Sequence, residues 1–144
     1  MVLELKVRLV NNEAILPRYA HEGDAGLDLF AVERQEIMPG EVARIRTGIA
    51  IELPENTEAQ IRPRSGLAYK HRVTVLNTPG TVDCGYRGEI EVILINHSDK
   101  VFTINAGDRI AQMVIKPVLT VNVKEVTTLS ATNRGKNGFG STGN

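Results

Sequence analysis

Polar and apolar side chains alternate along several short stretches of the chain, beginning close to the N-terminus. Leu3, Leu5, Val7 and Leu9 alternate with charged residues, and a period of two is typical of a half-buried β-strand. Alternating or short apolar stretches predict further strands at residues 27–32, 45–53, 59–62, 90–96, 101–104, 109–115 and 119–126. The chain is therefore expected to consist mainly of short strands.

Helical periodicity is weak throughout the sequence. The octet from Pro63 to Lys70, with a proline at its start, is the place where one helical turn is expected. Turn-forming residues separate the strands at intervals of about eight to twelve residues. This spacing predicts an all-β barrel or sandwich with at most one short helix.

One segment in the middle of the chain carries a strong turn signal. Two β-branched runs, 73–76 and 81–82, flank Thr78-Pro79-Gly80. Proline sets φ at the first central position and glycine accepts a positive φ at the second, so a type II turn in a tight hairpin is predicted. The tip of this hairpin would offer backbone N–H and C=O groups to a planar ligand.

Residues suited to ligand binding follow directly after this turn, namely Asp83, Gly85, Tyr86, Arg87 and Gly88. A carboxylate, an aromatic face and a guanidinium would lie beside the ligand, and the two glycines would let the ligand approach the backbone. An ordinary hairpin followed by solvated polar residues accounts for the same pattern. This stretch alone does not decide between the two interpretations.

Composition narrows the class of protein. The 144 residues suit one domain, and 17 basic and 17 acidic residues leave no net charge to recruit nucleic acid or a membrane. The single cysteine, Cys84, excludes an internal disulfide and fits a reducing compartment. No apolar run approaches the ~20 residues needed to span a bilayer, and no signal-peptide pattern is visible. A soluble cytoplasmic protein is expected.

Residues 134–144 differ in composition from the rest of the chain. Four of these eleven residues are glycine, and chain ends are commonly poorly ordered. Phe139 argues against a merely frayed tail, because an apolar ring gains free energy only where it meets another surface. We therefore expect a single β domain at residues 1–133, followed by a C-terminal arm that binds a ligand. Groups in the arm that suit phosphate oxygens are glycine backbone N–H groups, Arg134, Ser141 and Thr142.

Five short motifs follow one another along the chain. They are Ala-Gly-Leu-Asp-Leu at 25–29, Pro-Arg-Ser-Gly-Leu-Ala at 63–68, the turn segment at 75–89, Gly-Asp-Arg-Ile-Ala-Gln at 107–112, and Arg-Gly with Gly-Phe-Gly-Ser-Thr-Gly at 134–135 and 138–143. Each is weak alone, but the ordered set resembles the homotrimeric dUTPases (deoxyuridine 5′-triphosphate nucleotidohydrolases) over nearly the whole chain. The resemblance implies a compact, barrel-like β fold of jelly-roll type with a flexible, glycine-rich arm.

The resemblance further implies hydrolysis of dUTP to dUMP and diphosphate, which limits uracil incorporation into DNA and supplies dUMP for thymidylate synthesis. Asp83 would act as the general base that activates a water for attack on the α-phosphorus. Mg²⁺ would be held mainly by the triphosphate, with Asp28 binding it through water, since Mg²⁺ keeps several waters. The catalytic residues implied are Asp83, Ser65 and Asp28.

The same resemblance implies how the substrate is recognised. Arg64 and Ser65 would contact the triphosphate near the scissile bond, and Gln112 would hold it further along. Uracil would be read by Asn77 and the turn backbone, which is too close for thymine's methyl group and presents the wrong edge to cytosine. Tyr86 would pack beneath the deoxyribose, where a ribose 2′-OH would clash. The substrate-binding set implied is Arg64, Ser65, Gly66, Asn77, Gly80, Thr81, Val82, Asp83, Tyr86, Gln112, Arg134, Phe139, Gly140, Ser141 and Thr142.

Three subunits of a homotrimer would share each active site. One subunit would supply the motifs of Asp28, Ser65 and Gln112, the second the turn, and the third the arm. Phe139 would stack on uracil while Arg134 and its neighbours close on the γ-phosphate, and an arm ordered by substrate would exclude water. Neither membrane binding nor direct binding of nucleic acid is expected.

Other functions remain open at this point. A dCTP deaminase shares the trimeric β fold, but it would need a glutamate acid/base near the cytosine edge, and the arm is not expected there. A non-catalytic trimer that binds nucleotide as a regulator or scaffold would normally have a damaged motif, and none is damaged. A nucleic-acid-binding barrel is disfavoured by the absence of an aromatic-studded basic strand.

Overall fold

The computed structural model describes residues 2–143, so Met1 of the predicted domain and Asn144 of the predicted arm lie outside the described residues. Its elements are β1 Lys6–Leu9, β2 Leu27–Phe30, β3 Gln35–Ile37, β4 Val42–Glu52, β5 Thr57–Arg62, α1 Ser65–His71, β6 Val73–Val75, β7 Gly80–Val82, β8 Glu89–Asn96, β9 Phe102–Ile104 and β10 Arg109–Pro117. The predicted all-β fold with at most one short helix is confirmed. The helix of this part of the chain is too short to cross a membrane.

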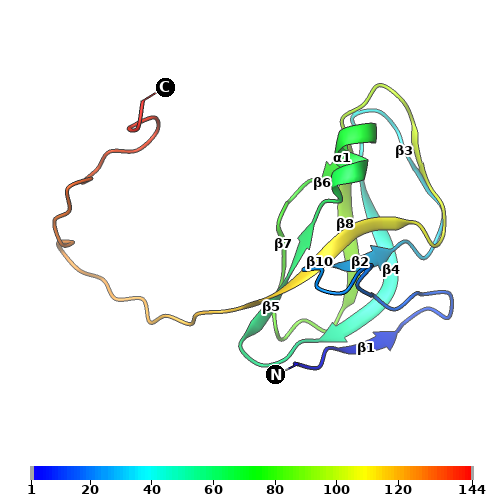
Figure 1. Cartoon of the computed structure of the whole chain (residues 1–144), viewed down its shortest axis with the longest axis horizontal. Coiled ribbons are helices and arrows are strands. Elements are labelled where there is room, and N and C mark those ends of the chain that lie inside the picture. Colours follow the sequence, from blue (N-terminus) through cyan, green and yellow to red (C-terminus); the bar gives the residue numbers. More distant parts are fainter. Residues whose placement is uncertain (1, 144) are drawn as a thin grey trace.

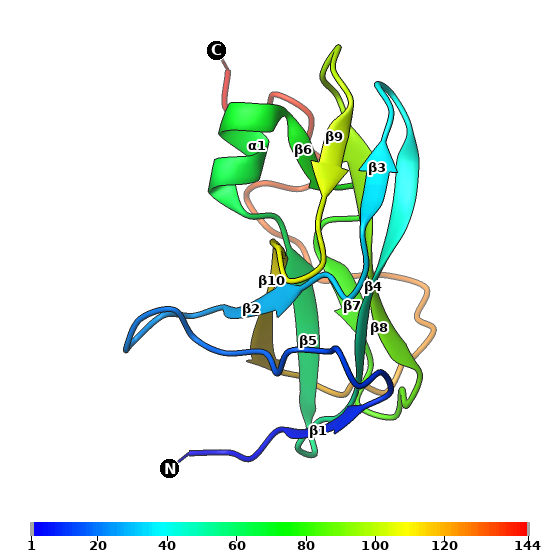
Figure 2. The same cartoon turned by 90° about the vertical axis from the view of Figure 1, so that its right-hand side faces the viewer.

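Two four-stranded sheets form the body of the molecule. One has the order β1-β4-β8-β6 and the other β2-β10-β5-β7, and β3 and β9 form a separate pair beside them (Figure 2). One hydrophobic cluster includes Ile45 and Val92 of the first sheet and Leu29, Ile61 and Met113 of the second. The sheets thus share an aliphatic core without closing into a single barrel.

β4 and β8 form a long ladder that a bulge interrupts at Gly48. Buried and partly buried residues alternate along β8, as expected of a strand with one face in the core. The register shifts between Arg46 and Ala50, where Gly48 has a φ of 72° and an added Cβ would lie 2.9 Å from Ala14 Cβ. Glu89 accepts hydrogen bonds from the Gly48 amide and Arg46 Nε, both at 3.1 Å, which fastens the bulge to the start of β8.

The first predicted strand, at residues 3–9, is confirmed only in its second half. β1 pairs with β4 from Lys6 onward. Leu5 and Val7 are half-buried as the alternation predicts, whereas Leu3 and Leu9 are exposed. The other predicted strands up to residue 115 and the helical turn are found, with ends displaced by a few residues.

The hairpin predicted around Pro79 is wrong. β6 pairs with β8 in one sheet, whereas β7 pairs with β5 in the other, so the turn leads the chain from sheet to sheet. The Thr78–Pro79 peptide bond is cis and Gly80 has no positive φ, so the turn is not of type II. Val75 and Val82 are both buried in the common core, and this burial, not local turn chemistry, decides their strand partners.

The strand predicted at residues 119–126 is also wrong. After Pro117 the described chain has no strand or helix, and it leads away from the sheets (Figure 1). Leu119, Val121 and Val123 are 91%, 75% and 95% exposed. A strand needs a hydrogen-bonding neighbour, and no strand within residues 2–143 pairs with this segment. The division between a domain and an arm at residue 134 stays a prediction.

Candidate functional site

Three of the five motifs meet where β2, β10 and β5 lie side by side. Asp28 on β2 stands opposite Gln112 on β10, and Gln112 stands opposite Arg62 at the end of β5. The chain continues from Arg62 to Pro63, whose carbonyl oxygen accepts a hydrogen bond from Gln112 Nε2 at 2.9 Å. Sheet register therefore brings the first, second and fourth motifs together.

Arg109 fixes the orientation of Asp28. The Asp28 side chain is buried, and its Oδ2 accepts a hydrogen bond from Arg109 Nε at 2.9 Å. The guanidinium groups of Arg109 and Arg18 each lie 5.2 Å from the centre of the Phe30 ring, which adds cation–π attraction. Oδ1 of Asp28 makes no hydrogen bond within residues 2–143 and can bind a water molecule or an ion.

This donor set fits an indirect contact with Mg²⁺ and does not form a protein cage. Within the described residues, no group of three or more His, Cys, Asp or Glu side chains could hold a metal ion. Mg²⁺ usually keeps several waters and binds through one or two carboxylates together with substrate phosphates. A single buried carboxylate with one oxygen committed to an arginine suits that arrangement.

The residue before α1 contacts the backbone of Arg109. Arg64 precedes the helix, and its Nη1 donates a hydrogen bond to the carbonyl oxygen of Arg109 at 3.2 Å. Ser65 and Gly66 are exposed in the first turn, where backbone N–H groups have no acceptor within the helix. Arg64, Arg109 and Asp108 line a cavity of about 290 Å³. The cavity thus combines two guanidinium groups, which attract an anion, with the Asp108 carboxylate, and the Ser65 hydroxyl and the amides of the first helical turn are exposed nearby.

Gly26 has a packing role that sequence reasoning missed. An added Cβ would lie 3.0 Å from Gln112 Cβ and 3.1 Å from its Cδ, and closer still to the amide oxygen. Gly26 has no positive φ, so the Gln112 side chain, not the backbone conformation, requires glycine. The only signal in the sequence is the membership of Gly26 in the first motif, which does not reveal the contact.

The residues expected to read the base lie on the turn between β6 and β7. Gly80 is buried and pairs with Ile61 of β5, Thr81 is exposed, and Val82 is buried. Asn77 is exposed, with its amide nitrogen 3.2 Å from a Cβ added at Gly80. The side chain of Asn77 and the backbone of Gly80 are therefore close neighbours at the start of β7.

Asp83 and Tyr86 line one cavity of about 320 Å³ together with Thr81 and Val82. The Asp83 carbonyl oxygen accepts a hydrogen bond from the Tyr86 amide at 3.1 Å, which closes a turn between them. The Tyr86 side chain is 47% exposed, and its hydroxyl donates a hydrogen bond to the carbonyl oxygen of Glu89 at 2.9 Å. A carboxylate and a fixed aromatic ring therefore face the same space.

Arg87 fastens this turn to the neighbouring strands. Its Nη1 donates hydrogen bonds to the carbonyl oxygens of Cys84 at 2.8 Å and Tyr86 at 3.3 Å, and its Nη2 lies 3.4 Å from Glu52 of β4. Glu52 also binds Lys6 of β1 at 2.8 Å. The hydrogen bond with Lys6, followed by the charges of Lys6 and Arg87, lowers the pKa of Glu52. Sequence reasoning expected Arg87 beside a ligand, whereas in this chain it supports the turn.

The arm forms a third, separate group. Residues 134–143 are exposed, and the Phe139 ring is fully so. Hydrogen bonds of the arm stay within residues 132–143 of the described chain. The cavities beside Arg64 and beside Asp83 share no lining residue. Within residues 2–143 the predicted site residues thus fall into three groups, of which the first two line different cavities and the third contacts neither.

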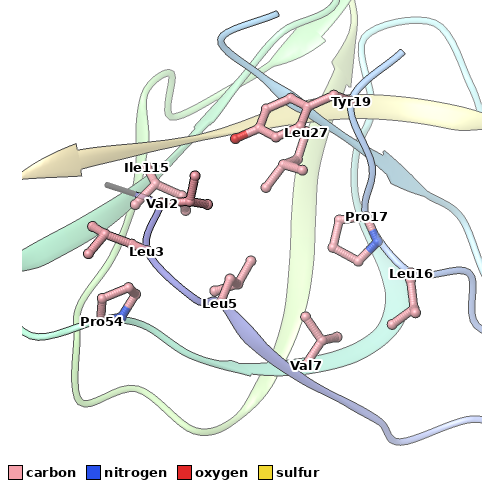
Figure 3. A pocket seen from close by; sticks show the side chains of 10 residues that line it. All are labelled: Val2, Leu3, Leu5, Val7, Leu16, Pro17, Tyr19, Leu27, Pro54 and Ile115. Atoms are coloured by element: carbon pink, nitrogen blue, oxygen red, sulfur yellow. The ribbon is translucent and has the colours of Figure 1, made fainter. Parts of the chain in front are cut away.

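A larger cavity, of about 720 Å³, contains none of the predicted site residues (Figure 3). Its lining side chains are apolar apart from the hydroxyl of Tyr19, and they come from the N-terminal segment and the adjoining strands. The lining residues are Val2, Leu3, Leu5, Val7, Leu16, Pro17, Tyr19, Leu27, Pro54 and Ile115. Because no carboxylate, histidine, lysine or arginine lines it, this cavity offers apolar surface but no phosphate chemistry.

Relatives of known sequence agree on one family. The dUTPase family model matches residues 12–143. A deoxyuridine 5′-triphosphate nucleotidohydrolase of Clostridium tetani is 65% identical over 139 residues, covering 96% of each chain. Another from Alkaliphilus metalliredigens is 62% identical over 142 residues, covering 99% of each chain.

Solved structures support the same assignment. A mutant dUTPase of Staphylococcus bacteriophage 80alpha with dUpNHpp has a TM-score of 0.92 at 29% identity, covering 99% of both chains. A mutant dUTPase of phage phi11, described with a structural Mg(II) ion, has a TM-score of 0.83 at 28% identity, covering 90% of this chain and 100% of that one. The resemblance seen in the five motifs is therefore confirmed, and the chain belongs to the dUTPase family.

Proposed function

We propose that this chain hydrolyses dUTP to dUMP and diphosphate, with Asp83 as the base that activates the attacking water. Membership of the dUTPase family supports the reaction. The observation that carries the mechanism is the cavity that Asp83 shares with Tyr86 at the end of β7. A carboxylate and an aromatic ring flank a backbone edge there, as a nucleoside site requires.

Asp83 takes a proton from water while the water oxygen forms its bond to the α-phosphorus. The bond from this phosphorus to the bridging oxygen breaks, and diphosphate leaves with that oxygen. A positioned base typically contributes 10²–10⁴-fold. Alignment and neutralisation of phosphate charge supply the rest, with Arg64, Ser65 and Gln112 as the proposed ligands.

Asp28 is the proposed contact to Mg²⁺, through water and through the oxygen that Arg109 leaves available. When bound, Mg²⁺ supplies charge neutralisation and alignment of the triphosphate. Because Arg109 Nε binds Oδ2 at 2.9 Å, the second oxygen of the carboxylate has a defined direction. Such supporting contacts commonly orient the groups that bind a metal.

Base and sugar are selected by different residues of the segment from Asn77 to Tyr86. The backbone from Gly80 to Val82 and the Asn77 amide pair with uracil and leave no room for a 5-methyl group. The Tyr86 ring lies against the deoxyribose and excludes a 2′-OH. Both contacts need a rigid frame, and the pairing of β7 with β5 supplies one for the base-reading backbone.

We also propose that the working form is a homotrimer in which each site takes one group from each of three subunits. The separation of the three groups on one chain supports this arrangement. Leu119, Val121 and Val123 are largely exposed, and the cavity of Figure 3 is apolar. Both surfaces gain free energy if another subunit covers them. Phe139 then closes over uracil and Arg134 over the γ-phosphate.

Substrate and reaction are tested together. The purified chain with Mg²⁺ is incubated separately with dUTP, dCTP, dTTP and UTP, and both diphosphate and ammonia are measured. Diphosphate from dUTP alone is expected. Ammonia from dCTP would instead indicate a deaminase, and no product from any of the four would indicate a nucleotide-binding protein that does not hydrolyse its ligand.

Mixed trimers test whether the sites are shared. Asp83→Asn chains and chains lacking residues 134–144 should each be nearly inactive. Trimers co-assembled from both chains should regain activity, because some sites combine an intact Asp83 with an intact arm from another subunit. Mixing Asp83→Asn with Asp83→Ala is the control, since no combination restores the base. Activity no greater than the sum of the separate chains would contradict shared sites.

A further inference from the structure

The ring of Tyr86 lies against the backbone of Gly88, two residues further along the chain. A Cβ built on Gly88 would be 2.6 Å from Tyr86 Cζ and 2.9 Å from Cε1, and closer still to the hydroxyl oxygen. Carbon atoms in favourable contact lie about 3.5–4.0 Å apart. Gly88 has no positive φ, so its backbone conformation accepts an alanine. The three atoms nearest to a side chain at this position all belong to the Tyr86 ring and its hydroxyl.

Two further contacts define the position of the ring. The Tyr86 hydroxyl donates a hydrogen bond to the carbonyl oxygen of Glu89 at 2.9 Å, and Glu89 is fastened by Arg46 Nε at 3.1 Å and the Gly48 amide at 3.1 Å. The Tyr86 amide binds the Asp83 carbonyl oxygen. The hydroxyl of the side chain and the backbone of Tyr86 are therefore both held by hydrogen bonds, and Gly88 leaves space for the ring between them.

We propose that Gly88 is a positioning residue that sets the discrimination between deoxyribose and ribose by seating the Tyr86 ring. This inference rests on the proposed role of Tyr86 at the sugar. Excluding a 2′-OH depends on a clearance of about one oxygen atom, so the ring must stay in one orientation. The expectation that Gly88 lets a ligand approach the backbone is replaced, because the protein's own ring fills that space.

An alanine at position 88 forces the ring away from its seat and breaks the hydrogen bond to Glu89. Because Tyr86 is about half exposed, the ring can move towards solvent while the sheets keep their packing. The space for a 2′-OH then opens. Small steric differences in a binding site are worth roughly 10–200-fold in discrimination, so the ratio of kcat/KM for UTP to that for dUTP should rise at least tenfold.

The experiment compares four variants of the full chain, each assayed with UTP and dUTP. Gly88→Ala and Tyr86→Ala should each raise the UTP to dUTP ratio, and the double variant should equal Tyr86→Ala alone. Gly85→Ala is the matched control. It adds the same methyl group in the same turn with no atom within 4 Å and without a positive φ, so the ratio should not change.

Each other outcome overturns the inference in a distinguishable way. If Tyr86→Ala changes the ratio and Gly88→Ala does not, the seating of the ring is irrelevant, while the proposed role of Tyr86 survives. If neither changes it, sugar discrimination lies elsewhere and both proposals fail. If Gly88→Ala changes the UTP to dUTP ratio equally in the native chain and in the Tyr86→Ala chain, Gly88 does not act through the ring. The same conclusion follows if Gly88→Ala unfolds both chains. Unfolding only where Tyr86 is present would support the contact.

Discussion

Replacing Gly26 by alanine tests whether two motifs far apart in the sequence depend on one packing contact. The added methyl carbon would lie 3.0 Å from Gln112 Cβ and 3.1 Å from Cδ, so the Gln112 side chain must leave its position. It then loses the hydrogen bond to the Pro63 carbonyl oxygen, now 2.9 Å long. We expect the variant to lose both stability and activity.

Typical costs of these two changes set the size of the losses. A lost hydrogen bond costs about 0.5–1.5 kcal/mol, and overpacking a well-packed site costs about 1–3 kcal/mol. The free energy of unfolding should therefore fall by about 1.5–4.5 kcal/mol. If Gln112 also loses a charge-assisted bond to the triphosphate, worth about 1.5–3 kcal/mol, kcat/KM for dUTP should fall by roughly one to two orders of magnitude.

The assay is urea-induced unfolding together with dUTP kinetics, for Gly26→Ala, Gln112→Ala and the double variant. Shortening Gln112 to alanine removes the amide oxygen and Cδ and leaves only the Cβ contact at 3.0 Å, so the added cost of Gly26→Ala should be smaller in this background. Gly85→Ala, whose new methyl meets open space, is the control. An equal cost in both backgrounds would refute the argument, because Gly26 would then matter for a reason other than Gln112.

Three further predictions concern the base, the metal and a surface ion pair. Asp83→Asn should still bind the non-hydrolysable analogue dUpNHpp in calorimetry but lower kcat by about 10²–10⁴-fold, and a near-normal kcat would remove Asp83 from the mechanism. EDTA should suppress turnover, with activity returning on added Mg²⁺; full activity in EDTA would exclude a required ion. Glu52, whose folded pKa is lowered, stabilises the chain above the ordinary glutamate pKa of 4.5, and this contribution disappears as pH falls through the folded value. The small difference in thermal midpoint between the native chain and Glu52→Gln at pH 7 should therefore vanish in acid, and a constant difference would show that Glu52 acts through packing.

Local patterns in the sequence predicted most of the element types and the candidate site residues. The apolar run at residues 90–96, rich in β-branched side chains, predicts the strand β8, because such side chains pack well on a sheet that faces a core. The five motifs likewise name residue types suited to the proposed contacts with phosphate, uracil and Mg²⁺. Family, fold class and candidate residues could be predicted because each depends on residues close together in the chain or on an ordered set of short patterns.

Only the tertiary structure decided which strands pair and which side chains share a space. β6 and β7 are joined by a short turn, yet burial of Val75 and Val82 in one core places them in different sheets. The contact between Gly26 and Gln112 joins residues 86 positions apart, and no local pattern reveals it. The alternation at residues 119–126 has the same period as that at residues 3–9, part of which forms β1, but a strand also needs a partner, and pairing is a property of the folded assembly and not of the segment.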